Sequence, residues 1–318
     1  MKAAAVLGNV NLDVICRPVD EVPRQDSILF EQGLALPGGC GSNTAIGLAC
    51  HGIQTRLIAL TGEDPTADLL FQHWSKAGVD VSLVARCPDQ ATGISVVLVD
   101  SDDQPRFVHT PGANTLLDES SLDTENLRQS GVAYLHVAGY FVLPGLLNDG
   151  FGAVLGEVKR AGINISLDVV TSPAMEEPAP LWNCLPALDV FLCNRKEAAR
   201  LTGIQDPSRA AGWLQARGAG AVIIKLGAEG CLLVDREGER ALPAPEVIDV
   251  VDTTGAGDAF AAGLVAALVA GCSLEEACLE GNRSGAEATR HLGAVKLPGT
   301  EPGGDSSGEH DVTRDGVG

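Results

Sequence analysis

Short apolar runs, each ended by glycine or polar residues, recur along most of the chain. Strands that are buried on both faces of a parallel sheet have this pattern. The runs predict strands at residues 3–8, 54–62, 133–137, 164–169, 189–193 and 221–226. Helices are predicted between them at residues 45–51, 64–77, 146–160, 195–202 and 208–215. This alternation indicates an α/β fold with a mostly parallel central sheet that is flanked by helices on both faces.

Three extended segments in the N-terminal half do not fit this alternation. Residues 27–36 have extended character, and residues 92–100 and 105–110 form a hairpin pattern around the polar turn 101–104. Together they predict a small sheet that lies apart from the main one.

A glycine-rich turn near the C-terminal end has the pattern of an anion-binding site. It lies between a predicted strand at 247–251 and a predicted small-residue helix at 256–270. Gly255 and Gly257 allow a tight turn, and the first N–H groups of the helix point toward any ligand there. Asp258 lies in the first turn of this helix. It is either a helix cap or a base that takes a proton from an attacking hydroxyl.

Two groups of polar residues in the N-terminal region are candidates for binding a substrate. Asn11 and Asp13 follow the first predicted strand, and side chains at i and i+2 of extended backbone face the same side. They are suited to vicinal hydroxyls, although a pair of turn residues has the same pattern. Gly38, Gly39 and Asn43 lie in a glycine-rich turn that opens the predicted helix at 45–51, which is a common form of ligand-contacting loop.

Two motifs in the C-terminal half have both a structural and a functional interpretation. Asn194 and Glu197 have the spacing of a helix capping box. Lys225, Gly227 and Gly230 form either a plain hairpin turn or a glycine-rich turn with a cation for phosphate.

Composition excludes several classes of function and location. The net charge of -20 argues against nucleic acid and anionic membranes as partners. Nine cysteines without a C-x-x-C pair are typical of free thiols in a reducing cytoplasm. The longest apolar run, 259–272, is too short to span a bilayer. We therefore expect a cytoplasmic protein.

The stretch DTTGAGDAFAAGL, from Asp252 to Leu264, resembles the C-terminal signature of the ribokinase family of carbohydrate kinases, also called the PfkB family. No G-x-x-x-x-G-K-[ST] loop occurs in the chain. The resemblance implies a ribokinase-like three-layer fold with a small β-sheet lid. It also implies ATP as phosphate donor, an anion hole for the transferred group and Asp258 as the base. The residues of the anion hole would be Gly255, Ala256 and Gly257.

Other positions match the motifs of the same family, and the resemblance gives each a role. Sugar binding is implied for Asn11, Asp13, Gly38, Gly39 and Asn43. Nucleotide binding is implied for Asn194, Lys225, Gly227, Gly230 and Asn282. Asp168 matches a position on the phosphate side. Metal sites are implied at Glu197 for Mg²⁺ and its waters, and around Asp252 and Thr254 for K⁺.

One departure from the family bears on the substrate. Cys40 follows the glycine pair, where ribokinases proper have lysine. A missing cation favours a neutral sugar over a sugar phosphate. The sequence thus predicts an ATP-dependent kinase that phosphorylates a hydroxymethyl group of a neutral sugar. A nucleoside kinase on the same fold and a non-catalytic regulator that binds sugar or nucleotide remain alternatives.

The resemblance also divides the chain into parts. It implies a kinase domain at residues 1–298, with a lid formed by about 14–36 and 92–112. Lids of this family often pair with a second subunit, which implies a homodimer. Residues 299–318 are rich in Gly, Asp, Glu and Ser and are predicted to be disordered.

Overall fold

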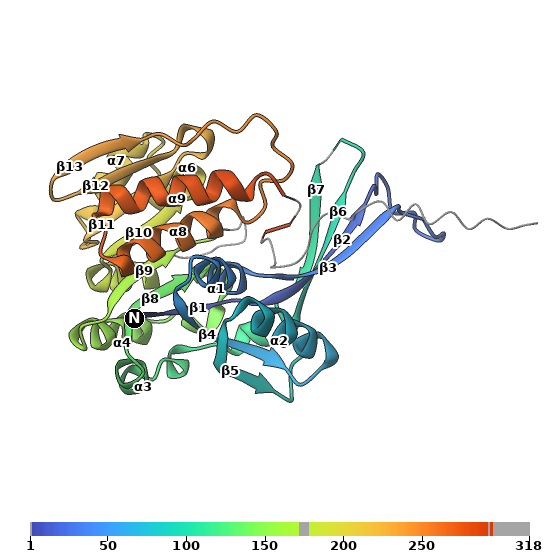
Figure 1. Ribbon diagram of the computed structural model, residues 1–318, viewed down its shortest axis with the longest axis horizontal. Helices are drawn as coiled ribbons and strands as arrows, with labels where there is room; N and C mark the ends of the chain where they lie inside the picture. Colours follow the sequence, from blue (N-terminus) through green and yellow to red (C-terminus); the bar gives the residue numbers. More distant parts are fainter. Residues whose placement is uncertain (1, 103, 172–177, 292, 295–318) are drawn as a thin grey trace, which may run out of the picture.

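A mostly parallel sheet forms the centre of the protein. The computed structural model describes residues 2–102, 104–171, 178–291 and 293–294 (Figure 1). Within them the main sheet has nine strands in the order β13-β12-β11-β10-β9-β8-β1-β4-β5, and its antiparallel pairs are β11–β12 and β12–β13. The strands are β1 (Ala3–Gly8), β4 (Gln54–Gly62), β5 (Asp80–Cys87), β8 (Val132–Ala138), β9 (Asn164–Asp168), β10 (Val190–Asn194), β11 (Ala221–Lys225), β12 (Cys231–Asp235) and β13 (Gly238–Leu242).

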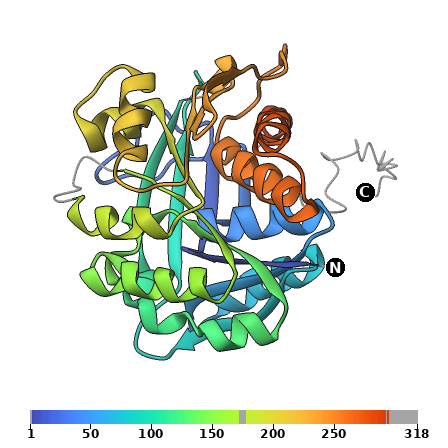
Figure 2. The same ribbon diagram turned by 90° about the vertical axis from the view of Figure 1, so that its left-hand side faces the viewer.

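Helices cover both faces of this sheet, as the sequence pattern predicts (Figure 2). The helices on one face are α1 (Cys40–Cys50), α2 (Pro65–Ala77), α8 (Ala256–Ala270) and α9 (Leu274–Ala288). Those on the other face are α3 (Thr124–Gln129), α4 (Asp149–Arg160), α5 (Ala179–Cys184), α6 (Arg195–Thr202) and α7 (Pro207–Gln215). Each layer buries its apolar stripe against the sheet, so that the three-layer α/β prediction is confirmed.

Small residues bring α1, α8 and α9 close together. A Cβ atom at Gly47 of α1 would lie 2.7 Å from the Cβ of Ala262 in α8. A Cβ atom at Gly263 of α8 would lie 2.3 Å from the hydroxyl oxygen of Ser284 in α9. Larger side chains at these positions would separate the helices. The small-residue composition of α8 therefore sets its first turn beside α1.

A small sheet stands away from the main body (Figure 1). Its strands, in spatial order, are β3 (Gln32–Gly38), β2 (Asn11–Arg17), β6 (Gly93–Val99) and β7 (Pro105–Thr110). Ile15, Val97 and Val99 form a buried apolar cluster on this sheet, and Leu36 packs against it. The predicted separate sheet is thus present, although the predicted segment 27–36 forms a strand only from Gln32 onward.

The predicted strand at 247–251 is wrong. This segment has no regular structure, and the Ile248 side chain is 88% exposed. The backbone N–H groups of Val251 and Asp252 donate to the carbonyl of Thr289 at the end of α9, at 2.8 and 3.2 Å. An apolar run forms a strand only where a partner strand pairs with it, and here the partner is a helix end.

Other boundaries differ from the prediction for local reasons. Helix α1 starts at Cys40, directly after Gly39 with φ 87°, and not at residue 45. Its first turn contains glycine and serine, which have low helix propensity and which the pattern therefore assigned to a loop. Strands β2, β5, β12 and β13 and helices α3 and α5 were not predicted. The predicted tail at 299–318 lies outside the described residues.

Two observations bear on the environment of the protein. Each cysteine lies in the described part of the chain and is free. No helix among the described residues is both long and apolar enough to cross a bilayer.

Candidate active site

Three neighbouring strands of the main sheet end in polar residues at the same edge. Asp168 ends β9, Asn194 ends β10 and Lys225 ends β11. Asn194 pairs with Lys225 in the ladder, and Asp168 pairs with Leu192 of β10. Ligands of open α/β sheets bind outside the carboxyl ends of the strands. We therefore expect a ligand to bind at the edge of the sheet where these three residues lie.

Helix α8 brings Asp258 to this edge. The helix begins after Gly255, whose φ of 75° favours glycine, and Asp258 lies in its first turn. A carboxylate oxygen of Asp258 accepts a hydrogen bond from the Asn43 amide of α1 at 2.9 Å. The side chain is thus held by a neighbouring helix, a contact that a plain helix cap does not need.

Lys225 lies over the same first turn of α8. A Cβ atom at Gly257 would lie 3.3 Å from the Lys225 ammonium nitrogen. That nitrogen donates to the Asp168 carboxylate at 2.5 Å, and both side chains are largely buried. The glycine therefore leaves room for the cation beside the N-terminal amides of the helix.

The charges of this cluster shift one another's ionisation. Loss of water around the Asp258 carboxylate raises its pKa, and the charge of Asp168 raises it further. Burial raises the pKa of Glu197 to about 7, again with a contribution from Asp168. Burial lowers the pKa of Lys225, but Asp168 and Glu197 outweigh this effect and hold it above its usual range. The ammonium is thus charged, and the carboxylates around it have increased proton affinity.

The predicted sugar-binding residues lie together on β2 and at the end of β3. The Asn11 amide donates to the Asp13 carboxylate, and Asn11 pairs with Gly38 in the ladder. A Cβ atom at Gly38 would lie 2.2 Å from a carboxylate oxygen of Asp13, and one at Gly39 would lie 2.8 Å from the Asn11 side-chain oxygen. With the Asp13 and Asn11 side chains as they lie, there is no room for a Cβ atom at either position.

Burial also changes the ionisation of Asp13. It raises the pKa of this carboxyl to about 6, against a smaller opposing effect of the Asn11 hydrogen bond. The charge of Asp258 contributes in the same direction as burial. The charges of Asp13 and Asp258 therefore influence each other.

Asn194 and Glu197 form the capping box that their spacing predicts. The Glu197 N–H donates to the Asn194 side chain at 2.9 Å, and the Asn194 N–H donates to the Glu197 carboxylate at 2.7 Å. Glu197 is buried. The structural interpretation is thus confirmed, and the predicted role at Mg²⁺ stays a prediction.

The glycine-rich turn and Asn282 meet at the end of β13. Gly227 and Gly230 have φ values of 67° and 96° in the turn between the antiparallel strands β11 and β12, as the hairpin interpretation predicts. A Cβ atom at Gly230 would lie 2.1 Å from the Leu242 carbonyl oxygen. Asn282 is buried, and its amide donates to the same oxygen at 3.0 Å. Asn282 is therefore fixed in the interior, against the end of β13.

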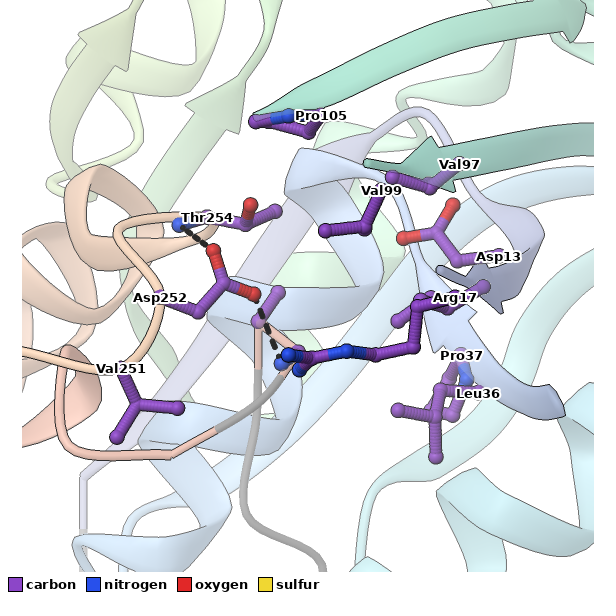
Figure 3. Close-up of a pocket in the computed structure, with 13 residues that line it drawn as sticks. Asp13, Arg17, Leu36, Pro37, Val97, Val99, Pro105, Val251, Asp252 and Thr254 are labelled. Carbon is purple, nitrogen blue, oxygen red and sulfur yellow. Dashed lines mark hydrogen bonds between the residues drawn. The ribbon is translucent and has the colours of Figure 1, made fainter. Parts of the chain in front are cut away.

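The predicted cation site is a compact loop (Figure 3). The two carboxylate oxygens of Asp252 accept from the Thr254 N–H at 2.8 Å and from the Gly293 N–H at 3.0 Å. A Cβ atom at Gly255 would lie 2.3 Å from the Ala294 side chain. The loop is thus packed against the start of α8. Within the described ranges, no three or more His, Cys, Asp or Glu side chains form a cluster that could hold a metal by themselves.

Sequence reasoning missed Arg17. Its side chain enters a pocket between the small sheet and the Asp252 loop, which Asp13 and Val99 also line (Figure 3). Asp13, Ile15 and Arg17 alternate along β2 and face the same side. The same alternation in the sequence could have predicted that Arg17 lies on the face of β2 that carries Asp13. It places a cation in the same pocket as the acidic residues.

Comparisons with known proteins identify relatives of this chain. Residues 1–299 match the family described as pfkB family carbohydrate kinase. The chain is 32% identical over 268 residues to 2-dehydro-3-deoxygluconokinase of Bacillus subtilis, with 81% of each chain covered. It is 32% identical over 289 residues to aminoimidazole riboside kinase of Salmonella typhimurium, with 87% of this chain and 88% of that one covered.

A solved structure extends the similarity to three dimensions. The structure of Arabidopsis thaliana ribokinase complexed with ribose and ATP has a TM-score of 0.81 and 28% identity, and covers 92% of this chain and 95% of that one. The chain therefore belongs to the pfkB family of carbohydrate kinases, the sugar and nucleoside kinases that transfer phosphate to an alcohol group.

Proposed function

We propose that the protein transfers the γ-phosphate of ATP to a hydroxymethyl group of a neutral sugar, with Asp258 as the base. The observation that carries this proposal is the contact between Asn43 and Asp258 at the first turn of α8, with Lys225 over the same turn. It supports a base, an anion site and a cation within one small space.

Asp258 accepts the proton of the sugar hydroxyl as the hydroxyl oxygen forms its bond to phosphorus. The bond between that phosphorus and the oxygen of the leaving ADP breaks in the same reaction. Asn43 donates to Asp258 and so fixes the direction of the carboxylate. Its own side-chain oxygen is buried and has no hydrogen-bond partner among the described residues, so it is available to a sugar hydroxyl.

The start of α8 provides the anion hole. Gly255 is the N-cap of α8, and Ala256 and Gly257 begin its first turn, where the helix dipole favours negative charge. Lys225 adds a full positive charge beside them. These groups stabilise the charge on the transferred phosphoryl group. A Cβ atom at position 257 would crowd the ammonium at 3.3 Å, which supports the role of this glycine.

The nucleotide side of the site consists of Asn194 and the turn around Gly227 and Gly230, with Asn282 behind it. The space in front of Gly227 is open, since a Cβ atom there would meet nothing within 4 Å. The ribokinase structure complexed with ribose and ATP supports ATP as the phosphate donor. Glu197 and Asn194 would hold the water shell of Mg²⁺, which when bound neutralises phosphate charge. We also assign K⁺ to the backbone around Asp252 and Thr254.

The substrate side supports a neutral sugar. Asn11, Asp13 and Asn43 provide acceptors and donors for hydroxyls, and Gly38 and Gly39 allow close approach of the backbone. Arg17 shares its pocket with Asp13 and Asp252, so the pocket has no surplus of positive charge. Its apolar wall is aliphatic and consists of Ile15, Leu36, Val97 and Val99. Base stacking in a nucleoside kinase would favour aromatic side chains instead.

We assign the small sheet, about 14–36 and 92–112 of a kinase domain at 1–298, as a lid that excludes water from the sugar. Apolar side chains on its strands are exposed, with Phe107 at 52% and Val108 at 63%. They support a homodimer through this sheet, which sedimentation equilibrium tests. The free cysteines support a cytoplasmic location.

A screen for ADP release with many acceptors tests the proposed function. The acceptors are neutral sugars, sugar phosphates and nucleosides, and the Asp258→Asn variant is the control. We expect the highest kcat/KM with a neutral sugar. A higher value with a sugar phosphate would overturn the neutral class, and one with a nucleoside would establish the alternative. Sugar or ATP binding without any turnover would instead identify a regulator.

A further inference from the structure

Asp168 is an acidic residue at the site to which the proposed mechanism gives no step. It lies at the end of β9 and is buried. One carboxylate oxygen accepts from the Lys225 ammonium at 2.5 Å, and the other accepts from the backbone N–H of Val169 at 2.9 Å. The carboxylate is thus fixed at both oxygens and oriented toward the cation.

The contact with Lys225 crosses a whole strand. Lys225 ends β11 and Asp168 ends β9, and β10 lies between these two strands. The side chain of Lys225 therefore extends over the end of β10, where its ammonium meets both Asp168 and the first turn of α8. A lysine side chain has four rotatable bonds, so its direction depends on its partner.

Lys225 has two other acidic neighbours. The charges of Glu197 and Asp258, besides that of Asp168, raise its pKa. Of the three, Asp168 is the one in direct hydrogen bond with the ammonium. Without it, the ammonium would be drawn toward Glu197 or toward Asp258 itself. Asp168 thus determines which of the three acids the cation contacts.

We propose that Asp168 is a positioning residue, which holds the Lys225 ammonium over the first turn of α8 and strengthens Asp258 as the base. This inference rests on the proposed function, because it assigns Asp168 an action through two residues of that mechanism. In this role Asp168 touches neither substrate nor nucleotide. It keeps the cation at the anion hole and away from the base, so that charge stabilisation and proton abstraction stay separate.

The charges around Asp258 support the proposal that Asp168 strengthens it as the base. Among the described residues, the charged or titratable groups that face it are Asp168 of β9, Lys225 of β11, Cys40 of α1 and Asp13 of β2. Next to burial, the charge of Asp168 raises the pKa of Asp258, whereas Lys225 lowers it. Replacement of Asp168 by asparagine removes the negative charge that raises the pKa of Asp258. It also frees the Lys225 ammonium to approach Asp258 and lower this pKa further. Both changes lower the pKa of Asp258 and move the acidic limb of kcat to lower pH.

The test compares Asp168→Asn, Lys225→Met and the double variant in steady-state kinetics across pH. We expect Asp168→Asn to lower kcat by about 10- to 100-fold, since a misplacement of about 1 Å can have an effect of this size. The KM for the sugar should stay unchanged, and the acidic limb should move to lower pH. In the Lys225→Met background the same change should have little further effect on kcat, because the two residues act as a unit.

A second lysine–aspartate pair provides a matched control. Lys159 forms an ion pair with Asp189, which also accepts from the Ile165 N–H, outside the candidate site. Asp189→Asn should change thermal stability only. If Asp168→Asn does not fold, Asp168→Glu keeps the charge and lengthens the side chain by one methylene. It should then lower kcat and leave the acidic limb in place.

Two results would overturn the inference. One is a folded Asp168→Asn variant with unchanged kcat and an unchanged acidic limb, which would leave Asp168 a purely structural acid. The other is full additivity of the Asp168 and Lys225 effects. Failure of the proposed function itself would differ, because wild-type protein would then turn over no acceptor. In that case carbon-13 NMR titration of the Asp258 carboxyl still decides, since Asp168→Asn should lower its pKa without any turnover.

Discussion

Asp13 is expected to lower the stability of the protein at neutral pH, and its replacement by asparagine should raise it. The pKa of this carboxyl is about 6 in the folded protein, against an ordinary value of 3.8, mainly because burial disfavours its charged form. A group whose pKa is raised on folding contributes stability at low pH and loses it as pH rises through the folded value. At neutral pH the folded protein therefore holds an ionised carboxylate at an energetic cost.

The magnitude follows from the two pKa values. Their difference corresponds to at most about 3 kcal/mol at pH 8, and to about half of that at pH 5, at 1.36 kcal/mol per pH unit. Asparagine keeps the side-chain oxygen that accepts from Asn11. The hydrogen bond from Asn11 then goes to a neutral oxygen instead of a carboxylate and is weaker, which offsets about 1 kcal/mol of the gain in stability. A net stabilisation of about 2 kcal/mol is thus expected at pH 8, and less at pH 5.

Urea unfolding at pH 5 and pH 8 measures the difference in the free energy of unfolding between Asp13→Asn and wild type. The matched control is Asp20→Asn, because hydrogen bonds from the Ser101 N–H and hydroxyl lower the pKa of Asp20. That control should lose stability at pH 8, with the opposite sign. The reasoning would be refuted if Asp13→Asn were less stable than wild type at pH 8. It would also be refuted if the stability difference between the two proteins did not depend on pH. A large loss of sugar affinity should accompany the gain, since Asp13 is assigned to sugar hydroxyls.

Three further predictions concern the loop and the pocket. Gly255→Ala should lower both stability and kcat, because φ is 75° and the new Cβ would lie 2.3 Å from Ala294; thermal melts and kinetics check this, and normal values would contradict it. Arg17→Ala should raise the KM for the sugar with little change in kcat, and an unchanged KM would remove Arg17 from the substrate pocket. Replacement of K⁺ by tetramethylammonium should lower kcat, and equal rates would argue against a cation at Asp252 and Thr254.

Much of the fold was predictable because local pattern and tertiary structure agree in the parallel core. Strands such as β1 and β11 are short apolar runs between turn residues, and burial on both faces of the sheet produces such runs. The run at 247–251 has the same pattern but meets the end of α9 in place of a strand. Pairing partners distant in sequence decide such cases, and pattern alone does not contain them.

The candidate site was predictable where one segment carries the chemistry. The turn that holds Gly255 and Asp258 is contiguous, and so is the capping box of Asn194 and Glu197. Contacts between segments were not predictable. The hydrogen bond from Asn43 to Asp258 joins residues 215 positions apart, and that from Lys225 to Asp168 spans 57 positions. Neither has a signature in spacing, because the order of strands and the packing of helices bring these residues together.

Asp258→Asn tests the central claim most directly. The change keeps the size of the side chain and an oxygen that accepts from Asn43, but removes the base. We predict a fall in kcat of about 10² to 10⁴, the range that general-base catalysis supplies, with an unchanged or raised melting temperature and unchanged or tighter ATP binding. A variant that folds normally and keeps more than about a tenth of wild-type kcat would contradict the account.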